Sequence, residues 1–226
     1  MKYILTILGL LFISKAAICQ QYDELKILYA DEDYKKLVSK ALKYTENDKT
    51  KKEVAPYIWV AKGLYAISES GETDEKYKKA YKDAINYLSK GLKYDLKLNG
   101  GSTFEEFSEF IEEFKMSLFF RISNEIESEE YKKAYSWAIK YTKITKNTVG
   151  AKYIAGACKY SLSDPGTSRT LWNEGDAMLK VVTEIESWDE ADKNMLMMGV
   201  YYSARSLKAK RQAEKARAFM NKVAQW

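Results

Sequence analysis

The sequence of 226 residues contains no histidine. Histidine is the commonest general base, the usual partner of a nucleophilic serine or cysteine, and the commonest metal ligand. The chain also lacks a Walker A sequence, a Gly-x-Gly-x-x-Gly loop and a Gly-x-Ser-x-Gly turn, which mark phosphate, dinucleotide and hydrolase sites. We therefore expect a protein that is not an enzyme and that needs no cofactor or metal.

Cysteine, proline and glycine are also scarce, with two, two and 11 residues. So few prolines and glycines favour long helices and argue against a turn-rich β-protein. Removal of an N-terminal segment that includes Cys19 would leave Cys158 alone, without a partner for an intrachain disulfide. We interpret Cys158 as a small residue buried at a helix crossing, since one cysteine is too few for the usual zinc site.

The charge is nearly balanced, with 37 Lys and Arg against 32 Asp and Glu. Such a balance produces no overall field that would attract nucleic acid. A local basic cluster lies near the C-terminus and consists of Arg205, Lys208, Lys210, Arg211, Lys215 and Arg217. Because an exported protein rarely meets nucleic acid, we interpret the cluster as a solvated face or a site for an acidic partner.

The N-terminus has the pattern of a secretory signal peptide. Lys2 is followed by the apolar run 3–13, which is shorter than the roughly 20 residues of a membrane span. Ala17 and Cys19 are small residues at the −3 and −1 positions of a cleavage before Gln20. We therefore expect a signal peptide at 1–19 and a mature chain in the periplasm or cell envelope of a bacterium.

Two alternatives to this cleavage remain. Cys19 could be the acylated first residue of a lipoprotein, although that processing prefers a small residue where Ile18 stands. The N-terminal segment could also remain as an uncleaved anchor. No second long apolar run follows, so we expect contact with a membrane to be peripheral or through Cys19.

The remaining residues, 20–226, predict a single all-α domain. Apolar residues recur at intervals of three and four, and period-two alternation is missing. The expected helices cover about 22–30, 32–46, 56–68, 73–95, a segment from 102 onward, 129–145, 149–161, 168–186, 187–208 and 211–224. Ser102 with Glu105 and Ser187 with Glu190 have capping-box spacing. The short connections predict antiparallel helix hairpins.

The segment from 102 onward separates apolar and acidic residues. Its apolar stripe is expected in the core and comprises Phe104, Phe107, Phe110, Ile111, Phe114, Leu118 and Phe119. Its acids fall elsewhere and comprise Glu105, Glu106, Glu109, Glu112 and Glu113. We interpret them as a solvated face, because exposed carboxylates lack the burial that general acid–base pairs use.

A degenerate repeat is visible in the spacing of aromatic and small residues. Tyr-Lys-Lys-Leu-x-x-x-Ala-x-x-Tyr begins at residue 34, and related patterns begin at 81, 131 and 213. They resemble the second helix of a tetratricopeptide repeat. Trp59 with Gly63 and Met195 with Gly199 resemble the large and small pair of its first helix. The closing proline is absent, so an irregular α-bundle with small residues at its crossings is the alternative.

The resemblance implies a fold and a use. Its hairpins would stack as an α-α superhelix, and the first helix of each pair would line a groove. The corresponding positions here are Tyr57, Val60, Leu64, Lys193, Leu196 and Val200. The resemblance implies a scaffold that binds a protein or peptide, in envelope assembly or secretion. The alternative is a glycan or small-molecule binder, because Tyr and Trp can stack on sugars.

Overall fold

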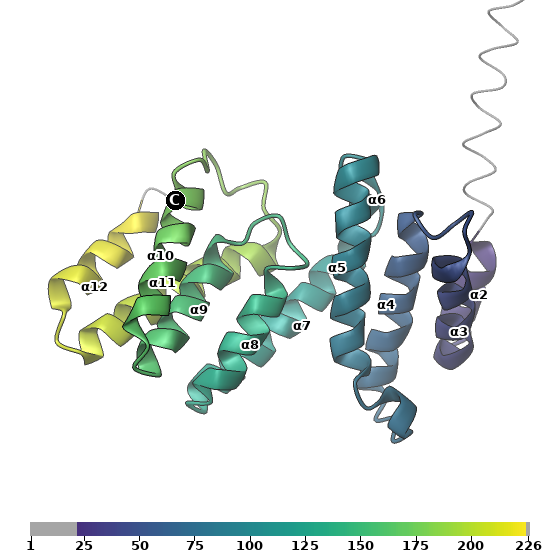
Figure 1. Cartoon of the computed structure of the whole chain (residues 1–226), viewed down its shortest axis with the longest axis horizontal. Coiled ribbons are helices and arrows are strands. Elements are labelled where there is room, and N and C mark those ends of the chain that lie inside the picture. The colour runs from purple at the N-terminus through teal and green to yellow at the C-terminus, as the bar shows by residue number, and fades with distance from the viewer. Residues whose placement is uncertain (1–21, 225–226) are drawn as a thin grey trace, which may run out of the picture. The chain divides into compact units, whose positions relative to one another are not determined.

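The computed structural model describes residues 22–224, and the predicted signal peptide at 1–19 lies outside them. Helices are the only regular secondary structure of the described residues (Figure 1), which confirms the all-α prediction. None of these helices is both long and apolar enough to cross a membrane.

Contacts divide the chain into two compact units, with the boundary between Glu105 and Glu106. The sequence led us to expect one domain over 20–226, and the two compact units are described separately below. The boundary falls where helix α6 (Ser102–Glu106) gives way to α7 (Ser108–Glu127). Phe107 separates them because its backbone, at φ −109° and ψ 19°, leaves the helical conformation.

The first unit is a sequence of neighbouring helices. It contains α2 (Asp23–Ala30), α3 (Tyr34–Glu46), α4 (Val54–Glu69), the short 3-10 helix η1 (Glu75–Tyr77), α5 (Ala80–Leu98) and α6. Helix α3 packs against α2 and α4, and α4 also packs against α5. Ten of the 16 residues of α4 are therefore buried.

A buried carboxylate of α5 binds the segment that follows this helix. Asp95 accepts hydrogen bonds from the backbone N–H groups of Thr103 (3.2 Å) and Phe104 (2.9 Å). These groups would otherwise lack partners at the start of α6. The chain turns back toward Asp95 through Gly100 and Gly101, whose φ angles of 64° and 99° favour glycine.

The second unit is built around α9. It contains α7, α8 (Tyr131–Tyr141), α9 (Val149–Ser161), α10 (Pro165–Leu179), α11 (Glu190–Ala209), α12 (Ala213–Met220) and the 3-10 helix η2 (Asn221–Val223). Helix α9 packs against α8, α10 and α11, and α11 also packs against α7 and α12. Nine of the 13 residues of α9 are buried, because partners cover it on several sides.

Two glycines let α9 and α11 approach backbone to backbone. A Cβ on Gly150 would lie 2.4 Å from backbone atoms of Met195 and Leu196. A Cβ on Gly199 would lie 2.5 Å from the carbonyl oxygen of Gly150. Real Cβ atoms do not come so close to a backbone, so only glycine fits at either position.

The same turn connects four pairs of helices: α2 with α3, α7 with α8, α9 with α10, and α11 with α12. In each turn a residue other than glycine has φ between 57° and 60°, namely Glu32, Glu129, Ser163 and Arg211. The next residue donates its N–H to the carbonyl five residues earlier, as Asp33 does to Leu28 and Gln212 to Leu207. This is the Schellman pattern that ends a helix. The same helix-ending turn therefore occurs at these four junctions.

Some predicted helix boundaries were wrong. The sequence placed 162–167 between two expected helices, but Pro165 begins α10 and the Asp164 side chain accepts from the N–H of Thr167. Proline is favoured at this first position because its missing N–H is not needed there. The helix expected over 168–186 ends at Leu179. The patterns that begin at 34, 131 and 213 coincide with the first residues of α3, α8 and α12.

The contact between α9 and α11 generates a stability prediction. Gly150→Ala should lower the free energy of unfolding by about 3 kcal/mol, because the new methyl group meets backbone atoms that cannot rotate away. Gly166→Ala in α10 is the control, since the nearest atom that its new Cβ would meet is Asp164 Oδ1 at 4.0 Å. It should raise stability by about 0.5–1 kcal/mol. Urea denaturation followed by circular dichroism measures both, and equal stability of the two variants would contradict the close approach.

Candidate functional site

The first unit contains an open cleft of about 520 Å³. Helices α3 and α5 form its sides, while Leu64 of α4 and the turn η1 complete it. The lining consists of Val38, Leu42, Leu64, Lys76, Tyr77, Asp83, Asn86, Tyr87 and Lys90. Val38 and Leu64 are buried and provide an apolar base, whereas most of the lining from η1 and α5 is polar. The cleft therefore offers apolar contacts at its base and charged or hydrogen-bonding groups around it.

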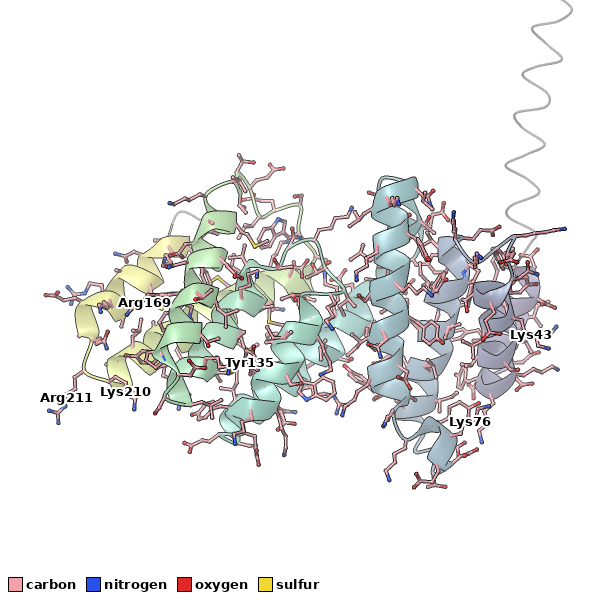
Figure 2. The ribbon with its side chains drawn as sticks, in the orientation of Figure 1. Lys43, Lys76, Tyr135, Arg169, Lys210 and Arg211 are labelled. Carbon is pink, nitrogen blue, oxygen red and sulfur yellow. The ribbon has the colours of Figure 1, made fainter. Side chains whose placement is uncertain are left out.

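The polar part of the cleft offers mixed charges and hydrogen-bonding groups. Lys76, Asn86 and Lys90 are exposed, and Figure 2 labels Lys76 where η1 projects from the unit. The Lys90 ammonium lies 5.0 Å from the centre of the Tyr57 ring, a distance at which a cation is attracted by the ring face. Burial and the nearby carboxylate of Asp83 raise the pKa of Tyr87, so its phenol remains a neutral donor.

The six predicted groove residues do not form one surface. Leu64 lines the cleft, but Tyr57 and Val60 have no exposed surface because α3 and α5 cover α4. In the second unit Leu196 and Val200 belong to the apolar core. Lys193 is partly exposed and pairs with Glu190 on its own helix. Of the six predicted groove residues, only Leu64 lines the cleft.

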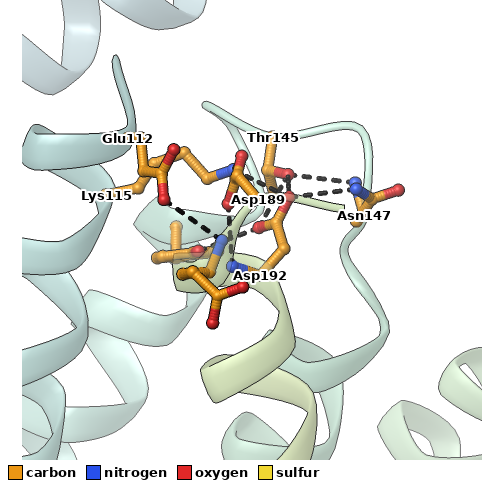
Figure 3. A network of polar contacts seen from close by, with 8 residues as sticks. Glu112, Lys115, Thr145, Asn147, Asp189 and Asp192 are labelled. Carbon is orange, nitrogen blue, oxygen red and sulfur yellow. Dashed lines mark hydrogen bonds and ion pairs between the residues drawn. The ribbon is translucent and has the colours of Figure 1, made fainter. Parts of the chain in front are cut away.

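A buried polar network lies in the second unit, where the start of α11 meets α7 and the segment between α8 and α9 (Figure 3). Lys115 of α7 and Asp192 of α11 are 3% and 2% exposed. The Lys115 Nζ atom lies 2.7 Å from Asp192 Oδ2 and also contacts the Asp189 carboxylate. A buried ion pair of this kind is stable only when further hydrogen bonds complete it.

Three neutral donors complete the network around Asp192. The Tyr141 hydroxyl donates to Asp192 Oδ1 at 2.8 Å, and the Thr145 hydroxyl donates to Oδ2 at 2.8 Å. The Asn147 amide donates to Oδ2 at 3.0 Å. Asp192 thus joins α8, the following segment and α7 to the start of α11.

Carboxylates also satisfy the N-terminal N–H groups of α11. Asp189 accepts from the N–H of Asp192 at 2.9 Å, and Glu112 accepts from the N–H of Glu190 at 3.2 Å. Negative charge is favourable at this end of a helix. The sequence suggested that Ser187 begins this helix in a capping box, but Asp189 is the capping residue because its carboxylate accepts from the N–H of Asp192.

Burial determines the protonation chemistry of the network. It raises the pKa of Asp192, and the Lys115 charge opposes that rise. Burial and the charge of Asp192 also raise the pKa of Tyr141 well above its usual range. Neither cavity described in this section is lined by network residues. Because Lys115 and Asp192 are buried and paired, we assign the network to stability.

Sequence reasoning did not identify the network, although a signal was present. Lys115 lies four residues after Ile111 and three before Leu118, within the apolar stripe of α7. Asp192 lies three residues before Met195 and four before Leu196, within the buried face of α11. A charged residue within an apolar stripe predicts a buried charge that needs a partner. Glu105, Glu106, Glu109 and Glu113 are exposed, as predicted for a solvated face.

A second, smaller cavity of about 220 Å³ lies in the second unit and is lined in part by Cys158, Tyr131, Tyr202 and Arg205. Cys158 is buried, as predicted, and has no disulfide partner among the described residues. Burial raises the pKa of its thiol from 9.0 to about 12. The thiolate fraction at neutral pH is then about a thousandfold lower than for an unperturbed cysteine.

Within residues 22–224, no group of His, Cys, Asp and Glu side chains could hold a metal ion. Comparisons of the chain with family models, curated proteins and solved structures found no match. The candidate site therefore depends on the geometry of the first-unit cleft.

The buried ion pair predicts a large penalty when one partner is removed. Lys115→Met and Asp192→Asn should each lower the free energy of unfolding by about 3–5 kcal/mol, because each leaves a buried group without its partner. The double variant should lose less than the sum of the single losses. Urea denaturation of the four proteins measures this coupling, and additive losses would contradict the pairing.

The same variants test how the stability of the folded protein depends on pH. Without the Lys115 charge that opposes it, the pKa of Asp192 should rise further above 3.8 in the folded Lys115→Met variant. The folded state then binds more protons than the unfolded state, so stability should fall as pH rises above 3.8. This extra slope should be absent from the Lys115→Met/Asp192→Asn variant.

The Cys158 thiol should react slowly in the folded protein. In a Cys19→Ser background Cys158 is the only thiol. Its rate with Ellman's reagent at about pH 8 should be at least about a hundredfold lower in the folded than in the urea-unfolded chain. Similar rates in both states would show that the thiol is accessible.

Proposed function

We propose that the protein is an exported scaffold built from tetratricopeptide-like hairpins, and that it binds a partner protein or peptide in the cleft of the first unit. The N-terminal pattern at 1–19 supports export, and the cell envelope is the proposed location. The cleft is the observation that carries the binding role. Envelope assembly or secretion is the proposed process.

The composition of the cleft favours a peptide segment. Leu42, Val38 and Leu64 can take an apolar side chain, while the Asn86 amide can both donate to and accept from a peptide backbone. Lys76 and Lys90 provide positive charges, and Asp83 provides a negative one. An apolar centre with a polar edge is the usual anatomy of a protein interface.

The recurring turn supports the tetratricopeptide-like part of the proposal. Four hairpins share one backbone geometry, and three of their second helices begin with the sequence pattern seen at 34, 131 and 213. A chain built by repeating one hairpin would produce this agreement between turn and pattern. The turn alone is a common way to end a helix, so the proposal depends on its coincidence with the sequence pattern.

A glycan is the alternative ligand, but the cleft offers it little aromatic surface. Stacking of a sugar requires an accessible ring face, and Tyr77 is only 8% exposed. Tyr87 is partly buried, and its phenol faces the charges of Asp83 and Lys90. These observations favour a peptide over a sugar.

Substitutions on one helix test the proposed binding. Asn86→Trp with Lys90→Glu places an indole in the cleft and reverses one of its charges. The control, Lys93→Glu with Leu98→Trp, introduces the same two side chains with the same change in net charge at exposed positions of α5 outside the cleft. The partner is identified as the protein that co-purifies with the wild type from envelope extracts in a fixed ratio. This partner should bind the cleft variant at least about tenfold more weakly than it binds the wild type.

The control variant should bind that partner as the wild type does. Equal losses in both variants would show that the partner does not use the cleft. Binding to a glycan array that disappears only in the cleft variant would instead favour the glycan alternative.

A further inference from the structure

The positive charge of the chain is concentrated in one segment. Residues 205–217 contain six Lys and Arg and one acid, Glu214, and so have a net charge of +5. The whole chain also has a net charge of +5, so its other residues are balanced. The segment covers the end of α11, the following turn and most of α12. We call its six cations, Arg205, Lys208, Lys210, Arg211, Lys215 and Arg217, the basic end.

The cations of the basic end are directed to solvent. All six are exposed, and among the described residues none forms an ion pair with an acid. Figure 2 shows Lys210 and Arg211 extending from the turn between α11 and α12. Arg205 is the least typical member, because it lies over the Tyr202 ring and lines the smaller cavity with Glu129.

The backbone beneath these cations is held firmly. Phe219 of α12 packs its ring 4.9 Å from that of Tyr153 and 5.3 Å from that of Trp172. The Gln212 amide donates to the Tyr160 hydroxyl at 2.6 Å. Arg169 of α10 is exposed three residues before Trp172, so it adds a cation near α12. The second unit thus exposes several long cationic side chains on a backbone that packing holds in place.

We propose that the basic end docks the second unit onto an anionic phospholipid surface. Lipid headgroups carry mobile negative charges, so they can gather under flexible cations without matching a fixed geometry. Met220, which is 46% exposed beside these cations, supplies an apolar contact with the headgroup region. In this arrangement the second unit binds the membrane, and the first unit binds the partner.

The other anionic partners fit these residues less well. Single-stranded nucleic acid is bound by cations interleaved with exposed aromatic rings, and segment 205–217 contains no aromatic residue. An acidic protein binds best where charges are fixed in complementary positions. Here the five cations other than Arg205 line neither described cavity.

Vesicle binding tests the proposal with the full chain. Sedimentation with phosphatidylcholine vesicles, with and without phosphatidylglycerol, gives the partition coefficient for each surface. The N-terminal apolar run at 3–13 would act on both vesicles, so the difference between them is the readout. Each cation near an anionic surface contributes about a fivefold gain in partition. Lys210→Gln, Arg211→Gln and Lys215→Gln together should reduce binding to the anionic vesicles on the order of 100-fold.

The matched control removes three exposed cations elsewhere in the same unit, Lys132→Gln, Lys143→Gln and Lys146→Gln. It should bind nearly as the wild type does, and circular dichroism should show both variants folded. Raising the salt to about 1 M shortens the Debye length to about 3 Å and should abolish the preference for anionic vesicles.

Three results would overturn the proposal. The first is equal binding of the wild type to neutral and anionic vesicles. The second is equal loss of binding in the control and basic-end variants. The third is binding to polyglutamate or to a DNA duplex that is stronger than binding to anionic vesicles and is lost in the basic-end variant. That result would assign the surface to an acidic protein or to nucleic acid.

Discussion

Short turns force each helix of this protein to bury its apolar face against a neighbour. Within the first unit α4 has α3 on one side and α5 on the other, and it has almost no polar face. Within the second unit α9 is covered by three helices, and small residues line it because a larger side chain would separate the backbones. Helix length, glycine position and burial all follow from this constraint.

The sequence predicted a helix best where a periodic apolar pattern ended at residues that disfavour a helix. The spacing of Leu37, Val38 and Ala41 predicted α3, and the gap between the helices expected over 73–95 and from 102 onward predicted the break after α5. Boundaries were less predictable, because proline at 165 can mark either a turn or the first residue of a helix. The break between α6 and α7 also gave no sequence signal, because Phe107 continues the apolar stripe although its backbone leaves the helix.

The candidate site was only partly predictable, and the reason is how the helices are covered. The groove positions were assigned by analogy with a first helix that has one free face. Helix α4 has no such face, so Tyr57 and Val60 are core residues. Leu64 lines the cleft. The polar members of the cleft, such as Asn86 and Lys90, lie on α5, where their solvent-facing positions gave no sequence signal.

The Lys115 network has a consequence for the order in which the second unit folds. Hairpin contacts join residues close in sequence and can form early, whereas Lys115 and Asp189 are 74 residues apart. Contacts between such distant residues require a large loop to close first. The ion pair therefore closes a loop that contains α8, α9 and α10, and its closure costs more chain entropy than that of a hairpin contact. The network would then distinguish the finished unit from a partly assembled stack of hairpins, in which Lys115 remains hydrated.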